Sequence, residues 1–85
     1  MYALETMKED YLLFCRTQKE LNAKTLKAYR IDLTQFIVFS ASSDNPFSRE
    51  NLNAYLSMLH ERYQPKTTKR KIASLKAFFH YLEFE

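Results

Sequence analysis

Residues 21–36 read LNAKTLKAYRIDLTQF, and this stretch indicates the class of fold. Apolar side chains recur in it every three or four positions, which is the period of one face of an α-helix. These are Leu26, Tyr29, Leu33 and Phe36. Asn22 precedes them, and its side-chain oxygen is a good acceptor for the free N–H groups of a first helical turn. The pattern predicts a helix over residues 23–39.

The same periodicity predicts three more helices, on either side of this one. They cover about residues 4–19, 49–62 and 66–83. Their expected core residues are Leu4, Met7, Tyr11, Phe14, Leu52, Tyr55, Leu56, Leu59, Ile72, Leu75, Phe79 and Leu82. Residues 40–47 are rich in turn formers, and Ser48 offers a cap for the helix that follows.

The composition is typical of a helical domain without cross-links. The chain has no glycine, on which β-hairpins and phosphate-binding loops rely for left-handed backbone conformations. Hydrophobic residues make up 46% of the chain, enough for one packed core. The lone Cys15 cannot form an internal disulfide, and His60 and His80 lack the spacing of zinc ligands. We expect an all-α fold, a small four-helix bundle in one domain over residues 1–85, with no metal and no cofactor.

Positive charge is concentrated in two windows, residues 21–31 and 62–76. They hold nine lysines and arginines and no acid, whereas the rest of the chain holds four such cations and all ten acids. Each window covers the opening turns of a predicted helix, where cations oppose the helix dipole but free N–H groups attract anions. This one-sided charge favours a polyanion partner such as nucleic acid. The chain also lacks a secretion signal and a long apolar run, so we expect a cytoplasmic protein.

Two segments resemble the N-terminal core-binding domain of tyrosine recombinases, the phage-integrase and Xer-type family, whose fold is a SAM-like helical bundle. Residues 21–36 are similar to the family pattern of a small polar cap followed by T-L-x-A-Y-x-x-D-L-x-x-F. Residues 65–82, PKTTKRKIASLKAFFHYL, are similar to S-x-x-T-x-x-R-x-L-S-A-L-R-x-F-F-x-Y-L. The chain departs from the family at Glu20, where Gly is usual, and at Asn22 and Gln64, where Ser is common.

The resemblance implies a module that closes a clamp around double-stranded DNA at a recombination site, together with a catalytic domain of the same parent chain. It implies a DNA-facing set of residues on the second and fourth helices. The set is Asn22, Lys24, Thr25, Lys27, Arg30, Lys66, Thr67, Lys69, Arg70 and Lys71. Most of these side chains suit phosphate oxygens, while Arg30, Arg70 and Asn22 also suit the edges of guanine or adenine.

The residues with which this family cleaves DNA are missing from the sequence. The family uses a Tyr nucleophile with Arg and His residues and carries His-x-x-Arg, but here His60 is followed three positions on by Tyr63 and His80 by Glu83. Tyr81 lies in an aromatic cluster and is interpreted as a core or rim residue. We therefore expect no enzymatic activity from this chain and a recombinase of bacterial, phage or mobile-element origin as its parent.

A second hypothesis is a helical protein-interaction module, because small bundles also bind partner helices. It predicts exposed apolar side chains and an association that is insensitive to salt. The candidates are Ile31, Val38, Phe39 and Phe84. Contacts of this kind between recombinase protomers on DNA are compatible with the first hypothesis. A helix-turn-helix repressor is disfavoured, because its short turn often contains glycine.

Overall fold

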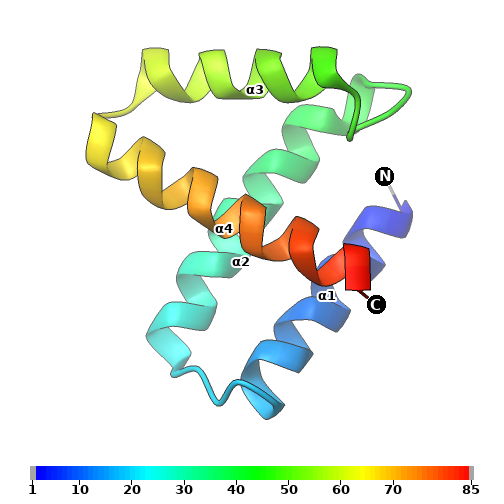
Figure 1. The fold of residues 1–85 in the computed structure, drawn as a ribbon, viewed down its shortest axis with the longest axis vertical. Coiled ribbons are helices and arrows are strands. Elements are labelled where there is room, and N and C mark those ends of the chain that lie inside the picture. The colour runs from blue at the N-terminus through cyan, green and yellow to red at the C-terminus, as the bar shows by residue number, and fades with distance from the viewer. Residues whose placement is uncertain (1, 85) are drawn as a thin grey trace.

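The computed structural model describes residues 2–84, which fold into four α-helices joined by short loops (Figure 1). The helices are α1 (Tyr2–Thr17), α2 (Ala23–Phe39), α3 (Arg49–Arg62) and α4 (Pro65–Phe84), and a 3-10 turn, η1 (Ser40–Ser42), follows α2. Within residues 2–84 there is no β-strand, and no helix is long and apolar enough to cross a membrane. The predicted all-α class is confirmed.

The helices form two antiparallel pairs that lie across each other. α1 and α2 are joined at one end by residues 18–22, and α3 and α4 are joined by residues 63 and 64. α4 crosses α2 near the middle of both helices, and its C-terminal end reaches α1 (Figure 1). As a result, the first turns of α2 and of α4 both lie on the left side of Figure 1, that of α4 above and that of α2 below.

The core lies where α4 crosses α2 and where α1 and α3 reach this crossing. Every helix contributes at least one side chain that is almost completely buried. These are Tyr11 and Cys15 of α1, Leu33 and Phe36 of α2, Tyr55 and Leu59 of α3, and Phe78 of α4. Phe78 is fully buried, although it was not among the core residues expected from the sequence. Met7 is a correction, because it was expected in the core and is 37% exposed.

Both side-chain caps predicted from the sequence are confirmed. The backbone N–H of Thr25 donates to Oδ1 of Asn22 at 2.8 Å, and the N–H of Asn51 donates to Oγ of Ser48 at 3.1 Å. α2 and α3 therefore begin where the sequence predicts, immediately after these two residues. A cap of this kind stabilises a helix by about 1 kcal/mol.

α1 begins and ends two residues before the range of 4–19 predicted for it. It ends early because the chain turns sharply at Glu20. This residue has a φ of 53°, in the left-handed region that favours glycine. Leu21, the next residue, donates its N–H to the carbonyl of Cys15 at 3.1 Å, which closes the end of the helix. The backbone thus keeps a glycine-like conformation at a position where the chain carries a side chain.

We expect Glu20→Gly to raise the free energy of unfolding by about 0.5 to 1 kcal/mol, because relief of the left-handed strain outweighs the added freedom of the unfolded chain. For a domain of this size that is an increase in Tm of about 2 to 8 °C, measurable by thermal unfolding followed by circular dichroism. Glu20→Ala is the control, since it removes the same carboxylate but keeps Cβ. A Tm for the glycine variant no higher than that of the alanine variant would contradict the explanation.

Candidate nucleic-acid interface

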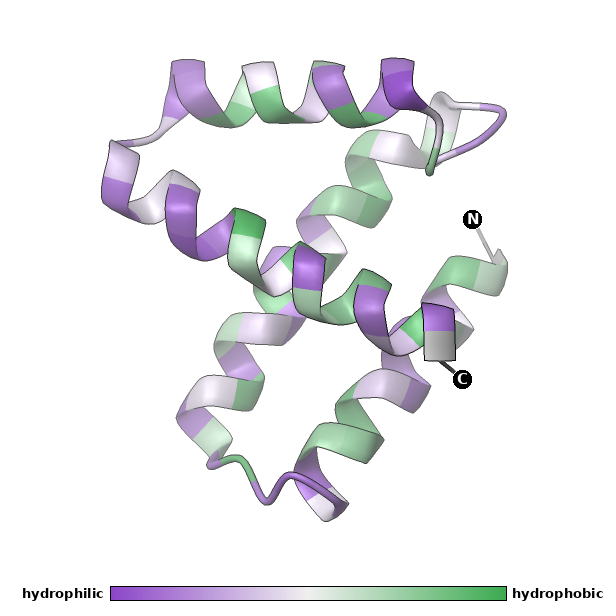
Figure 2. Ribbon diagram, viewed as in Figure 1, coloured by the Kyte–Doolittle hydropathy of each residue, from purple (hydrophilic) through white to green (hydrophobic). Residues whose placement is uncertain are grey.

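Four exposed lysines lie in the opening turns of α2 and α4, on the side of the molecule where both helices begin. We call Lys24, Lys27, Lys66 and Lys69 the basic surface. None of the four forms an ion pair with another residue in the described range, 2–84. Figure 2 shows hydrophilic residues along the first turns of α4. The ammonium groups are therefore available to an anionic partner.

The helix starts add neutral hydrogen-bonding groups to the basic surface. Asn22 caps α2 and Thr25 lies in its first turn, and Thr67 lies in the first turn of α4. Pro65 has no N–H, and the N–H of Thr68 already donates to the carbonyl of Gln64 at 3.0 Å. The backbone N–H groups of Lys66 and Thr67 are therefore the first-turn amides of α4 left free for an anion.

Lys71, which the sequence placed among the DNA-facing residues, is buried and does not belong to the basic surface. Its side chain is only 6% exposed, and its ammonium contacts Asp32 of α2 at 3.0 Å. It also donates to Oε1 of Gln35 at 2.8 Å and lies over the ring of Tyr63, 5.1 Å from the centroid. The sequence does carry a signal for this burial, since Lys71 precedes Leu75 by four positions and so lies on the same helix face.

Asp32 is the centre of a buried polar network that joins α2 to α4. Its carboxylate is 1% exposed and accepts three hydrogen bonds, all from α4. Oδ1 accepts from Nη2 of Arg70 and from Nζ of Lys71, both at 3.0 Å, and Oδ2 accepts from the hydroxyl of Ser74 at 2.9 Å. Sequence reasoning missed this role, because the partners are 38 to 42 positions apart in the chain.

The two arginines chosen from the sequence as candidate base readers are both held by carboxylates. Arg70 gives one nitrogen to Asp32, but 53% of its side chain is exposed, so its remaining N–H groups face outward. Both terminal nitrogens of Arg30 are engaged, because Nη1 and Nη2 donate to the two carboxylate oxygens of Glu9 on α1 at 2.6 and 3.1 Å. These hydrogen bonds from Arg30 are the main reason that the pKa of Glu9 lies below its usual range.

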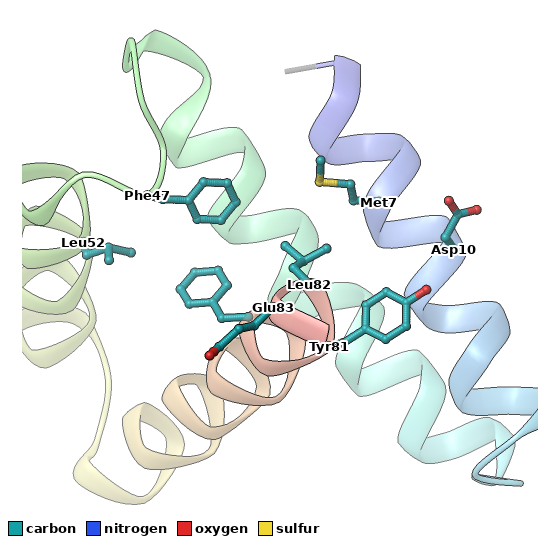
Figure 3. A pocket seen from close by; sticks show the side chains of 8 residues that line it. Met7, Asp10, Phe47, Leu52, Tyr81, Leu82 and Glu83 are labelled. Carbon is teal, nitrogen blue, oxygen red and sulfur yellow. The ribbon is translucent and has the colours of Figure 1, made fainter. Parts of the chain in front are cut away.

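The remaining surface holds the apolar features that the interaction hypothesis predicts. Ile31 and Val38 of α2 are 54% and 68% exposed, as expected, whereas Phe39 packs against Tyr55 with ring centroids 5.1 Å apart. The side chain of Phe84 lies outside the described residues. An apolar hollow of about 770 Å³ lies near the C-terminal end of α4, away from the basic surface (Figure 3). Its lining includes Met7, Phe47, Leu52 and Leu82, with Asp10 and Glu83.

Comparison with known proteins shows the family of this chain. The sequence model of the family described as phage integrase, N-terminal SAM-like domain, matches residues 9–85. A tyrosine recombinase of Agathobacter rectalis is 48% identical over 86 residues, which cover 100% of this chain and 28% of that protein. Tyrosine recombinase XerC of Herpetosiphon aurantiacus is 38% identical over 88% of this chain and 26% of its own length. XerD of Listeria monocytogenes is 34% identical over 87% of this chain and 27% of its own length.

The chain is therefore an all-α domain of the SAM-like class, and it belongs to the phage-integrase N-terminal SAM-like domain family. It spans somewhat more than a quarter of the length of these tyrosine recombinases. No solved structure matches it.

Proposed function

We propose that this chain binds double-stranded DNA at a recombination site and closes a clamp around it together with a catalytic domain of the same parent protein. We propose further that this parent is a cytoplasmic tyrosine recombinase, which cleaves and rejoins DNA strands. The observation that supports the proposal best is the basic surface: four exposed, unneutralised lysines at two helix starts on one side of the fold.

The contacts proposed for individual residues follow from their exposure. The lysines of the basic surface bind phosphate oxygens of the DNA backbone. The hydroxyl groups of Thr25 and Thr67 donate hydrogen bonds to the same DNA strands from the first turns of their helices. Arg70 is fixed at one nitrogen and presents the rest of its guanidinium to a base edge or a phosphate. Asn22 retains its amide N–H groups for DNA, because its oxygen caps α2. Lys71 acts from inside the fold and makes no contact with DNA.

A second, compatible role is proposed for the apolar surface. Ile31 and Val38 are exposed on α2, on the same helix face as Lys24 and Lys27. The hollow lies at the C-terminal end of α4, the opposite end of the helix from its lysines, and remains accessible when the lysines are engaged on DNA. These apolar surfaces favour contacts with other recombinase protomers as an additional function of the domain.

A salt titration of the unmodified domain tests DNA binding. We expect fluorescence anisotropy of a labelled duplex of about 25 base pairs to give a plot of log K against log salt concentration with a slope of about −4.5, since each of about five phosphate contacts contributes about −0.9. The five cations are the basic surface and Arg70. The proposal is wrong if the domain fails to bind at low salt, or if the slope is close to zero.

A further inference from the structure

Arg30 differs from the lysines of the basic surface in having its charge already engaged. Both terminal nitrogens of its guanidinium are bound by Glu9, at 2.6 and 3.1 Å. The pair lies at the surface, since the two side chains are 51% and 52% exposed. A carboxylate that grips a guanidinium with two parallel hydrogen bonds uses the same donors that a phosphate group would use.

We propose that Glu9 is a built-in competitor for DNA phosphate at Arg30 and that it limits the affinity of the domain for DNA. The inference rests on the proposed function, because it concerns how strongly the same surface binds. A phosphate takes the position between the two terminal nitrogens of Arg30 only after Glu9 has released them, so at this position the domain exchanges one anion for another and gains little affinity. The released carboxylate of Glu9 stays negative and also repels the phosphate backbone of the incoming DNA.

The surroundings of Glu9 make this exchange feasible. Lys8 lies 3.5 Å from the same carboxylate, and its own side chain is 6% exposed and held by Glu5 at 2.8 Å and by the hydroxyl of Thr34 at 3.1 Å. When Arg30 leaves, Glu9 therefore keeps a fixed cation beside it. The low pKa of Glu9 keeps it ionised at neutral pH, so the competition is permanent and is not switched by protonation.

There is also space for a phosphate beside the pair. A hollow of about 260 Å³ between α1 and α2 is lined by Glu9 and Arg30, with Leu12, Leu26 and Arg16 among the other residues. Arg16 is exposed. A phosphate that replaces the Glu9 carboxylate at Arg30 thus enters a site with a second guanidinium nearby.

The test compares Glu9→Gln with Glu5→Gln in the same salt titration. Both substitutions remove one exposed acid from α1, one helical turn apart, but only Glu9 binds Arg30. We expect Glu9→Gln to raise the affinity for the duplex about three- to tenfold and to steepen the salt slope by about 0.9, which corresponds to one additional phosphate contact. Glu5→Gln should change the affinity less than about twofold, through long-range charge alone.

Arg30→Ala completes a double-mutant cycle with Glu9→Gln. Alone it should weaken binding little, because Arg30 is already occupied, whereas added to Glu9→Gln it should remove the whole gain. Circular dichroism of each variant checks that the helices are intact.

The inference is overturned if Glu9→Gln and Glu5→Gln have equal effects, or if the gain survives the loss of Arg30. In either case the unmodified domain still binds with a steep salt slope, so the proposed function stands. Failure of all variants and of the unmodified domain to bind at low salt would instead reject the proposed function, and this inference with it.

Discussion

Asp32→Ala is expected to lower the free energy of unfolding by about 3 to 5 kcal/mol, because it leaves the ammonium of Lys71 buried without its counter-charge. The side chains of both residues are almost inaccessible to water, at 1% and 6% exposed. The substitution also removes one acceptor of the buried Ser74 hydroxyl, which then keeps only the carbonyl of Arg70, at 3.2 Å. Since domains are typically stable by only about 5 to 15 kcal/mol, this loss is a large part of the total.

Urea denaturation followed by circular dichroism measures this effect, and two variants make it specific. Asp44→Ala removes an exposed acid from the loop after η1 and should change stability by less than about 0.5 kcal/mol. Asp32→Ala combined with Lys71→Met removes both buried charges and should recover most of the loss, because an apolar side chain replaces the stranded ammonium. If Asp32→Ala and Asp44→Ala were equally stable, the network would not have the structural role assigned to it.

The second large effect is expected from the double variant Lys66→Ala/Lys69→Ala. We expect it to weaken DNA binding by between about tenfold and a hundredfold and to make the salt slope shallower by about 1.8, which is the loss of two phosphate contacts. The fold should not suffer, because both lysines are exposed in the opening turns of α4, where cations oppose the helix dipole. Binding and stability are therefore predicted to change in opposite directions.

Arg49→Ala is the matched control for these lysines. Arg49 is also an exposed cation in the first turn of a helix, but α3 begins on the side of the molecule opposite to the start of α4 (Figure 1). Fluorescence anisotropy at fixed salt should show nearly unchanged affinity for this variant. A loss as large for Arg49→Ala as for Lys69→Ala alone would show that overall charge, and not the basic surface, determines binding.

The elements of this fold are encoded locally, which is why the sequence predicts them well. The apolar period of α2 and the capping oxygens of Asn22 and Ser48 lie within a few residues of the turns that they determine. The early end of α1 was missed, because it depends on a left-handed residue, Glu20, whose identity gives no sign of that conformation. Propensity indicates glycine or asparagine at such a position.

The candidate site is less accessible to sequence reasoning, because its geometry depends on how the helices cross. Charge segregation gathers the cations into two windows, but a list of cations does not tell which of them are exposed and which have acidic partners. Lys71 forms an ion pair with Asp32, 39 positions away in the chain, and Arg30 forms one with Glu9, 21 positions away. Both pairs exist only because α2 packs against α4 and α1 against α2.

The position of the Asp32 network along its two helices has a mechanical consequence. The network is nine residues from the start of α2 and six from the start of α4, or about 14 and 9 Å of helix. The N-terminal parts of α2 and α4 thus extend as rigid segments from the Asp32 network, where the two helices are joined. A rotation of α2 by about 10° about the network would move the start of the helix by about 2 Å. This is comparable with the spacing of about 3.4 Å per nucleotide along one strand of DNA. The buried pair of Asp32 and Lys71 would in this way determine the distance between the starts of α2 and α4.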